Sequence, residues 1–243
     1  MKADNVRFVL VGAQTAGNVG SAARALKNMG FHRLVLVSPQ CDPLGVEARR
    51  LAVGAADLLD GAELHDELDR ALTGVTMAVG ATARTGKQRD PHWRVDELTN
   101  EMLRHADAHS LAVVFGREDS GLTDDELDRC SHLIYLPSSR AYRSINLAQA
   151  VMLVAYELRR GRLATPPDPL PQPAEHQERE AMFDHLEQSL REIGFLKDDP
   201  AESIMRRLRR VLGRRELSSV EVKLFRGIAR QTLWAARRGK GER

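Results

Sequence analysis

Short apolar runs alternate with amphipathic helical patterns over the first 160 residues, and this alternation restricts the possible folds most strongly. Runs rich in Val, Leu and Phe between Gly, Pro or polar residues are typical of buried strands. The predicted strands cover residues 7–11, 34–37, 75–80, 111–115 and 132–136. Helices between successive strands bring those strands side by side in one direction. The sequence therefore predicts an α/β fold with a mainly parallel sheet.

Four helices are predicted between and after these strands, at residues 18–29, 95–108, 123–130 and 146–160. Asn18 is a suitable N-cap for the first and Gly30 a natural stop. Thr123 with Glu126 forms a capping-box pattern at the start of the third. The fourth has an apolar stripe, which Ala150 and Leu153 widen: Leu147, Val151, Val154 and Leu158.

Five prolines between residues 165 and 173 separate two regions of different composition. Such a run cannot form helix or central strand. We therefore predict a domain at residues 1–162, a linker at 163–174 and a helical extension at 175–243. Its helices are expected at 175–193, 200–212 and 217–238, with two apolar faces. The first face is Phe183, Leu186, Leu190 and Ile193; the second is Val220, Leu224, Ile228, Gln231 and Ala235, with Leu217 and Phe225 beside it.

Charge is distributed unevenly along the chain. Residues 1–162 carry 20 Lys and Arg against 21 Asp and Glu, residues 163–203 carry 3 against 10, and residues 204–243 carry 13 against 3. A basic region of this kind is typical of nucleic-acid binding. An equally open alternative is that these arginines pair with the acidic segment before them.

Some classes of protein do not fit the sequence. No run reaches the ~18 apolar residues of a membrane span. The polar start lacks the apolar region of a secretory signal. Cys41 and Cys130 lack metal-ligand spacing, and no His, Asp or Glu cluster suggests a metal. We expect a cytoplasmic protein with two reduced thiols, no membrane contact and no metal.

Three polar loops follow predicted strands. The first, at residues 12–20, has three glycines, but a P-loop needs Lys after Gly17 and a dinucleotide fingerprint needs closer glycine spacing. Turn glycines with an Asn cap are the better interpretation. In the second loop, Gly116 would let a ligand approach the backbone, and Glu118 would lie in the crevice where open α/β sheets bind ligands. The third, at residues 136–146, is basic.

Together these loops resemble, in order and spacing, the three motifs of SPOUT-class RNA methyltransferases of the TrmH group. The motifs are Asn18-x-Gly20-x-x-x-Arg24, Phe115-Gly116-x-Glu118-x-x-Gly121-Leu122, and Pro137 followed by Ser144-Ile145-Asn146-Leu147. The downstream sequence and helical tail resemble the TrmJ type, whose members methylate the ribose at tRNA position 32. Ile145 departs from the usual Leu of the family.

The resemblance implies S-adenosylmethionine as cofactor, held in a deep trefoil knot near the C-terminal end of the α/β domain. The residues implied to line its site are Ala81, Thr82, Ala83, Gly116, Leu136, Arg143, Ser144 and Ile145. Arg24 is implied at the reacting ribose, with Ser144 and Asn146 holding the hydroxyl and the cofactor. Asn18 and Glu118 would fix the loops, and Glu118 could position Arg24.

The resemblance further implies a homodimer, in which Arg24 of one subunit faces the cofactor of the other. A tRNA anticodon stem-loop would be the partner. Its backbone is expected to contact basic residues of two loops and of the tail: Arg84, Lys87, Arg89, Arg140, Arg206, Arg207 and Arg210. Tyr142 and Trp93 could stack on an unpaired base, although core packing is the more probable role of Trp93.

Three alternatives remain open at this point. The target could be another tRNA position or ribosomal RNA. The chain could also be an RNA-binding protein that keeps the fold but has lost catalysis. A nucleotide hydrolase using residues 12–20 is disfavoured by the missing Lys.

Overall fold

The computed structural model describes residues 1–83, 92–139, 141–162, 173–197, 201–213 and 217–241. The chain divides into two compact units, Met1–Leu170 and Pro171–Arg243. None of the described helices is long and apolar enough to cross a membrane.

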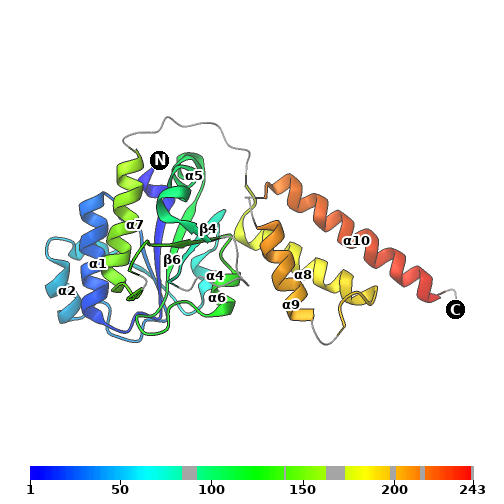
Figure 1. Cartoon of the computed structure of the whole chain (residues 1–243), viewed down its shortest axis with the longest axis horizontal. Coiled ribbons are helices and arrows are strands. Elements are labelled where there is room, and N and C mark those ends of the chain that lie inside the picture. The colour runs from blue at the N-terminus through cyan, green and yellow to red at the C-terminus, as the bar shows by residue number, and fades with distance from the viewer. Residues whose placement is uncertain (84–91, 140, 163–172, 198–200, 214–216, 242–243) are drawn as a thin grey trace. The chain divides into compact units, whose positions relative to one another are not determined.

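A seven-stranded sheet forms the centre of the first unit, in the order β3-β2-β1-β6-β4-β7-β5 (Figure 1). The strands are β1 Val6–Val11, β2 Leu34–Val37, β3 Glu63–His65, β4 Met77–Ala81, β5 His92–Arg94, β6 Leu111–Phe115 and β7 His132–Tyr135. Every neighbouring pair is parallel. The predicted α/β class is confirmed. The two edge strands, β3 and β5, were not predicted.

Helices cover both faces of the sheet. The bounds are η1 Ala3–Asn5, α1 Ala16–Met29, α2 Val46–Ala52, α3 Ala56–Asp60, α4 Leu68–Ala71, α5 Val95–Ala108, α6 Asp124–Asp128 and α7 Leu147–Arg162. One apolar core joins the sheet to α1, α2, α3, α5 and α7. A smaller core joins the other face to α4 and α6. The first unit therefore has three layers, with the thicker helical layer on the side of α1 and α7.

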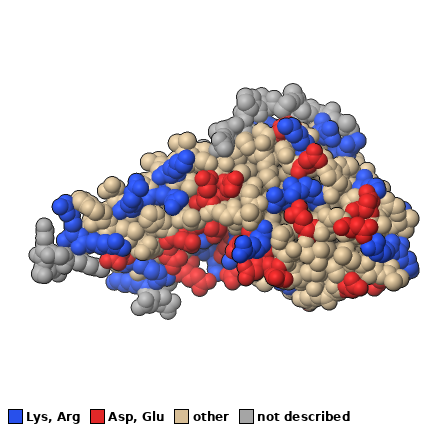
Figure 2. Space-filling view, turned by 180° about the vertical axis from the view of Figure 1, so that it is seen from behind, with Lys and Arg blue, Asp and Glu red and all other residues tan. Residues whose placement is uncertain are grey.

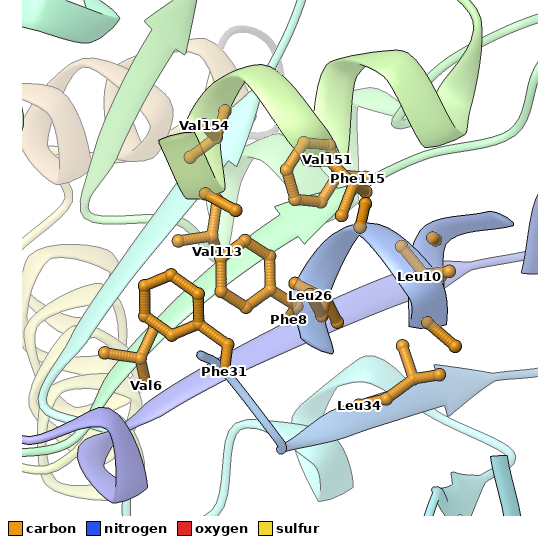
Figure 3. Close-up of a cluster of buried hydrophobic side chains, with 14 of the residues drawn as sticks. Val6, Phe8, Leu10, Leu26, Phe31, Leu34, Val113, Phe115, Val151 and Val154 are labelled. Atoms are coloured by element: carbon orange, nitrogen blue, oxygen red, sulfur yellow. The ribbon is translucent and has the colours of Figure 1, made fainter. Parts of the chain in front are cut away.

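Aromatic and branched side chains fill the larger core (Figure 3). Phe8 of β1 lies between Phe31, with ring centroids 5.1 Å apart, and Phe115 of β6, at 6.3 Å. Val151 and Val154 of α7 are fully buried in the same cluster. This packing fixes the carboxyl ends of β1 and β6, where the first two polar loops begin, relative to the start of α7, where the third polar loop ends.

The helix termini agree only in part with prediction. Thr123 and Glu126 form the expected capping box, and Gly30 ends α1 with a φ of 77°. Asn18, however, is not an N-cap, because α1 begins at Ala16 and Asn18 lies inside its first turn. Leu153 is 43% exposed on α7, so it does not widen the buried stripe of that helix.

The second unit consists of α8 His176–Glu192, α9 Ala201–Leu212 and α10 Ser219–Gly241. Met182 and Phe183 of α8 pack with Leu217 and with Val222 of α10. The predicted apolar face of α10 is wrong: Val220, Leu224 and Ile228 are at least half exposed. The buried residues of that helix are Val222, Ala229 and Leu233. Ile193, predicted on the buried face of α8, is 50% exposed and follows the helix.

Candidate functional site

A pocket of about 250 Å³ lies where the loops after β4, β6 and β7 meet. All eight residues expected to line a cofactor site contribute to its wall: Ala81, Thr82, Ala83, Gly116, Leu136, Arg143, Ser144 and Ile145. Ile134, Leu122 and Leu147 add apolar surface, and Glu118 and Asp119 add carboxylates. This combination of apolar wall and few polar groups is typical of small-molecule sites.

The loop after β6 is closed on itself. Arg117 and Gly121 exchange two backbone hydrogen bonds, of 3.1 and 2.9 Å. A Cβ atom at Gly116 would lie 2.1 Å from the carbonyl carbon of Gly121 and 2.2 Å from the nitrogen of Leu122. The glycine is therefore required by the tight loop itself. Gly116 also contributes to the pocket wall, and its role in the close approach of a ligand stays a prediction.

The Arg117 side chain is partly buried and pairs with Glu126. Its guanidinium donates to both carboxylate oxygens of Glu126, at 3.0 and 3.1 Å. Glu126 also accepts from the backbone N–H of Thr123 at 2.7 Å. Burial raises the pKa of Glu126, but the Arg117 hydrogen bonds and the Thr123 N–H outweigh burial and lower it. The pair fastens the loop to the start of α6.

Glu118 connects this loop to the start of α1. Its carboxylate accepts from the backbone N–H groups of Gln14 and Thr15, at 2.9 and 3.2 Å, and from the side-chain amide of Asn18 at 2.9 Å. Burial raises the pKa of Glu118, but the hydrogen bonds lower it by more, so the pKa lies below its ordinary value. Glu118 is therefore an ionised anchor between two loops.

Asn146 extends the connection to the third loop. Its Nδ2 donates to Oδ1 of Asn18 at 2.9 Å. Its own Oδ1 accepts from the backbone N–H groups of Ala148 and Gln149, at 3.0 and 3.3 Å, which makes Asn146 the N-cap of α7. Glu118, Asn18 and Asn146 thus form a relay of three side chains, one from each motif, that begins at Glu118 in the pocket wall.

Arg24 lies apart from the pocket. It is exposed on α1 and borders an open groove of about 960 Å³ together with Ser21, Asn28, Asn146, Gln149 and Met152. Among the described residues it has no hydrogen-bond or ion-pair partner. Glu118 accepts hydrogen bonds from Gln14, Thr15 and Asn18, and its positioning of Arg24 stays a prediction. Ile145 lines both the groove and the pocket.

The glycines of the first loop serve packing and turn formation. Gly12 has a φ of 62°, and a Cβ atom there would lie 2.7 Å from Nε of Arg117. A Cβ atom at Gly20 would lie 2.0 Å from the carbonyl oxygen of Ala48, because α1 and α2 are in close contact. The loop is therefore a set of structural glycines, as its sequence indicated.

Sequence reasoning missed four polar residues: Arg117, Asp119 and Ser120 in the pocket wall, and Gln14 beside Asp119. Gln14 donates to Asp119 at 3.0 Å, and Ser120 donates to Asp119 at 2.8 Å. Arg117 was not assigned a role. Gln14 lies in the first glycine loop, after β1, and Asp119 lies beside Glu118, after β6. Because β1 and β6 are neighbouring strands, the position of both residues at carboxyl ends could have indicated them.

The residues expected to contact RNA are only partly described. Arg84, Lys87, Arg89 and Arg140 lie outside the described residues. Tyr142 is 76% exposed near the pocket, whereas Trp93 packs against the larger core. In the second unit Arg207 is exposed, while Arg206 pairs with Glu202 at 2.8 Å. Arg210 is half-buried, and its Nε donates to the carbonyl of Arg206 at 3.4 Å.

The acidic segment does neutralise part of the basic tail. Arg209 donates to both carboxylate oxygens of Glu180 and lies 4.4 Å above the Phe183 ring. Other arginines of the tail remain exposed, and Figure 2 shows Lys and Arg side chains over the C-terminal helices. Both sequence-based interpretations of the charge therefore hold, for different residues. The described residues contain no group of His, Cys, Asp or Glu that could hold a metal ion.

Comparison with known proteins agrees with this arrangement. Residues 5–156 match the family model described as SpoU rRNA Methylase family, and residues 177–241 match tRNA methyltransferase TrmJ, C-terminal domain. The tRNA (cytidine/uridine/adenosine-2'-O-)-methyltransferase TrmJ of Pseudomonas aeruginosa (strain UCBPP-PA14) is 39% identical over 247 residues, or 96% of each chain. The tRNA (cytidine/uridine-2'-O-)-methyltransferase TrmJ of Pectobacterium atrosepticum is 38% identical, over 93% of this chain and 95% of its own.

A solved structure gives the same result. The crystal structure of TrmJ from Z. mobilis ZM4 superposes with a TM-score of 0.79 at 29% identity, covering 93% of this chain and 97% of that one. Both family models, the relatives and the fold agree over nearly the whole length. The chain therefore belongs to the SpoU rRNA methylase family and, with its C-terminal domain, to the TrmJ-type methyltransferases.

Proposed function

We propose that this chain is an S-adenosylmethionine-dependent tRNA ribose 2′-O-methyltransferase that acts on cytidine or uridine 32 of the anticodon loop. One observation carries the proposal: the second and third motif loops, far apart in sequence, line one pocket, and the Glu118–Asn18–Asn146 relay joins the first motif to both. Full-length relatives named as tRNA 2′-O-methyltransferases support the reaction and the substrate class.

The residues of the pocket fit the cofactor. Small side chains at Ala81 and Ala83 leave room beside the backbone, and Leu136 and Ile145 offer apolar walls for an adenine ring. Glu118 is ionised, and a carboxylate in a pocket wall favours a cationic ligand. When bound, S-adenosylmethionine supplies a methyl group already activated by a positive sulfonium.

The chain's own residues then have to orient the ribose and assist loss of the hydroxyl proton. A guanidinium such as that of Arg24 is a poor general base. We assign it to binding a neighbouring phosphate and to stabilising negative charge that develops on the 2′-oxygen. Ser144, which is exposed at the pocket, would hold the hydroxyl, with Asn146 fixing the start of α7 beside it.

The position of Arg24 supports a homodimer. Arg24 borders the groove along α1 and α7 and does not line the pocket of its own chain. Leu153, which lines the groove, and Tyr156, one turn further along α7, are 43% and 50% exposed. A second copy packed on this face would bring its Arg24 toward the pocket. We also propose the deep trefoil knot of the family, formed by the chain between β6 and α7.

The two units would divide the work. Residues 1–162 would form the methyltransferase domain, residues 163–174 a linker, and residues 175–243 a basic extension that holds RNA. Among the RNA contacts predicted from the sequence, exposed Arg207 and Tyr142 are suited to contact the backbone and an unpaired base. Arg84, Lys87, Arg89 and Arg140 remain proposed contacts of the same kind.

The test is methyl transfer from labelled S-adenosylmethionine to unmodified tRNA. We expect label on the ribose of nucleotide 32, and none on a tRNA carrying 2′-deoxyribose at that position. Label at another tRNA nucleotide or on ribosomal RNA would show that nucleotide 32 is not the target. Cofactor binding without transfer to any cellular RNA would instead favour an RNA-binding protein that has lost catalysis.

A further inference from the structure

A second hollow, remote in sequence from the motif loops, lies within the C-terminal unit. It has a volume of about 850 Å³ and lies between α8 and α10. Its lining combines three arginines with one aromatic ring: His185, Gln188, Arg230, Leu233, Trp234, Arg237 and Arg238. Arginines and a tryptophan on one face of a helix differ from the Leu and Val that line a core.

Trp234 is exposed where a large aromatic side chain would ordinarily be buried. It is 55% exposed, while its neighbour Leu233 is buried at 8%. The Arg238 guanidinium lies 4.6 Å from the centroid of the indole. The ring is therefore held by a cation on one side and remains accessible in the hollow.

The same unit contains a contrasting pair. Arg209 lies over Phe183 in a similar way, but Phe183 is buried and Arg209 is neutralised by Glu180. That pair serves folding of the unit. Arg238 has no carboxylate partner among the described residues, and its aromatic partner is exposed, so the same packing argument does not account for it.

The remaining arginines of the hollow also lack an acidic partner among the residues that the structure describes. Within the described part of the chain, Arg230 and Arg237 have no ion-pair partner. Arg191 and Arg206, by comparison, each pair with a glutamate one helical turn before them. Arg230 and Arg237 are two turns apart, about 10 Å along the axis, with Trp234 between them. A polyanion with flat apolar groups between its charges would match this spacing.

We propose that this hollow binds an unpaired segment of RNA, with a base stacked on Trp234 and phosphates on Arg230 and Arg237. Stacking on an aromatic ring between basic side chains is the usual means of holding single strands. A duplex hides its base faces and would use only the arginines. The inference rests on the proposed function, because it takes RNA as the substrate, and it adds a contact separate from the pocket.

The test uses the full chain and a short oligouridylate. Trp234→Ala should weaken binding about tenfold or more, whereas Trp234→Phe should keep most of the affinity because it keeps an aromatic face. Arg226→Ala is the matched control, since Arg226 is exposed on the same helix and does not line the hollow. Oligouridylate should quench tryptophan fluorescence in the wild type and in Arg226→Ala, and much less in Trp234→Phe.

Salt dependence separates stacking from charge. The slope of log affinity against log salt is negative, and Arg237→Ala should make it less steep by about 0.7. Trp234→Ala should leave the slope unchanged. Unchanged affinity in Trp234→Ala would overturn the inference. Equal competition by polyglutamate at matched charge would overturn it too, because it would show a surface for any polyanion.

Failure of the inference and failure of the proposed function give different results. If wild type and Trp234→Ala both methylate saturating tRNA and bind oligouridylate equally, the hollow is not an RNA site and the enzyme activity stands. If Trp234→Ala loses oligouridylate and the wild type methylates no tRNA, the hollow binds RNA and the proposed activity is wrong.

Discussion

Asn146 has two separate hydrogen-bonding duties, and each uses a different atom. Oδ1 caps α7 and Nδ2 reaches Asn18. Asn146→Asp keeps the capping oxygen but places a carboxylate against Oδ1 of Asn18. We expect the free energy of unfolding of Asn146→Asp to lie within about 1 kcal/mol of the wild-type value, and that of Asn146→Ala to be lower by about 1 kcal/mol or more. Both should lose most methyl transfer.

Thermal unfolding and methyl transfer to tRNA, measured side by side, check this separation. Arg162→Ala is a suitable control, since Arg162 is exposed at the other end of the same helix and lines neither the pocket nor the groove. Full activity in Asn146→Asp would show that the relay to Asn18 is dispensable.

Glu118 gives the molecule a defined response to acid. Its folded pKa lies below the ordinary 4.5 because of the hydrogen bonds from Asn18, Gln14 and Thr15, which outweigh burial. Because the pKa is lowered, the ionised carboxylate stabilises the fold at pH values above its ordinary pKa. This stabilisation is lost as the pH falls through the folded pKa. We expect Glu118→Gln to be less stable than the wild type at pH 7, by about 1–2 kcal/mol.

Denaturant unfolding at several pH values tests the sign. The difference between Glu118→Gln and the wild type should shrink as the pH falls below 4.5, because protonated Glu and Gln then offer similar groups. A difference that stays constant down to the acid transition would mean that the carboxylate charge contributes nothing.

The sequence identified Asn18, Glu118 and Asn146 as candidates but not their partners. Each has an ordinary local role available, as cap or surface residue. Asn18 meets Glu118 across 100 positions of the chain and Asn146 across 128. Such contacts depend on how β1, β6 and α7 meet, so local pattern could not separate the true cap, Asn146, from the false one, Asn18.

At the scale of the elements, the close contact of α1 with α2 predicts that Gly20 cannot be replaced without loss of stability. A Cβ atom at Gly20 would lie 2.0 Å from a backbone carbonyl, which cannot move aside like a side chain. We expect Gly20→Ala to destabilise the protein by about 1–3 kcal/mol. Gly227→Ala on α10 meets no atom within 4 Å and should stabilise it by about 0.5–1 kcal/mol.

Denaturant midpoints of the two variants provide the comparison. Opposite signs would show that close helix contact, and not glycine as such, sets the requirement at Gly20. A neutral Gly20→Ala would mean that α2 moves away without cost.

Element prediction succeeded where burial is strong and failed where it is weak. β2 and β6 were predicted to the residue, because they are continuous apolar runs buried on both faces. β3 and β5 have three residues each at the sheet edges, without an apolar run. On α10 two apolar stripes compete, and only contact with α8 selects the one containing Val222, Ala229 and Leu233.

At the scale of the whole molecule, the separation of Arg24 from the pocket allows a test of subunit cooperation. Arg24→Ala removes the arginine, and Ala83→Trp fills the pocket at an exposed position. Each variant alone should be inactive. If Arg24 acts on the partner's pocket, an equal mixture should recover about one quarter of the wild-type rate, because half of the dimers contain one intact site.

The rate of methyl transfer after mixing and re-equilibration is the measurement. Mixing each variant with itself is the control for refolding. A mixture that stays inactive, with dimers demonstrated, would place Arg24 and the pocket in the same subunit.

Ile145 is the only residue common to the pocket and the Arg24 groove among those described as lining them. A single side chain therefore forms a shared partition between two compartments. Any ligand that displaces it from one side alters the free energy of binding on the other, and thermodynamic linkage requires the effect to be equal in both directions. Where the family usually has Leu, this chain has a β-branched partition, whose restricted χ1 makes it stiffer. A cofactor in the pocket and a ribose in the groove would then contact the same Ile145 side chain.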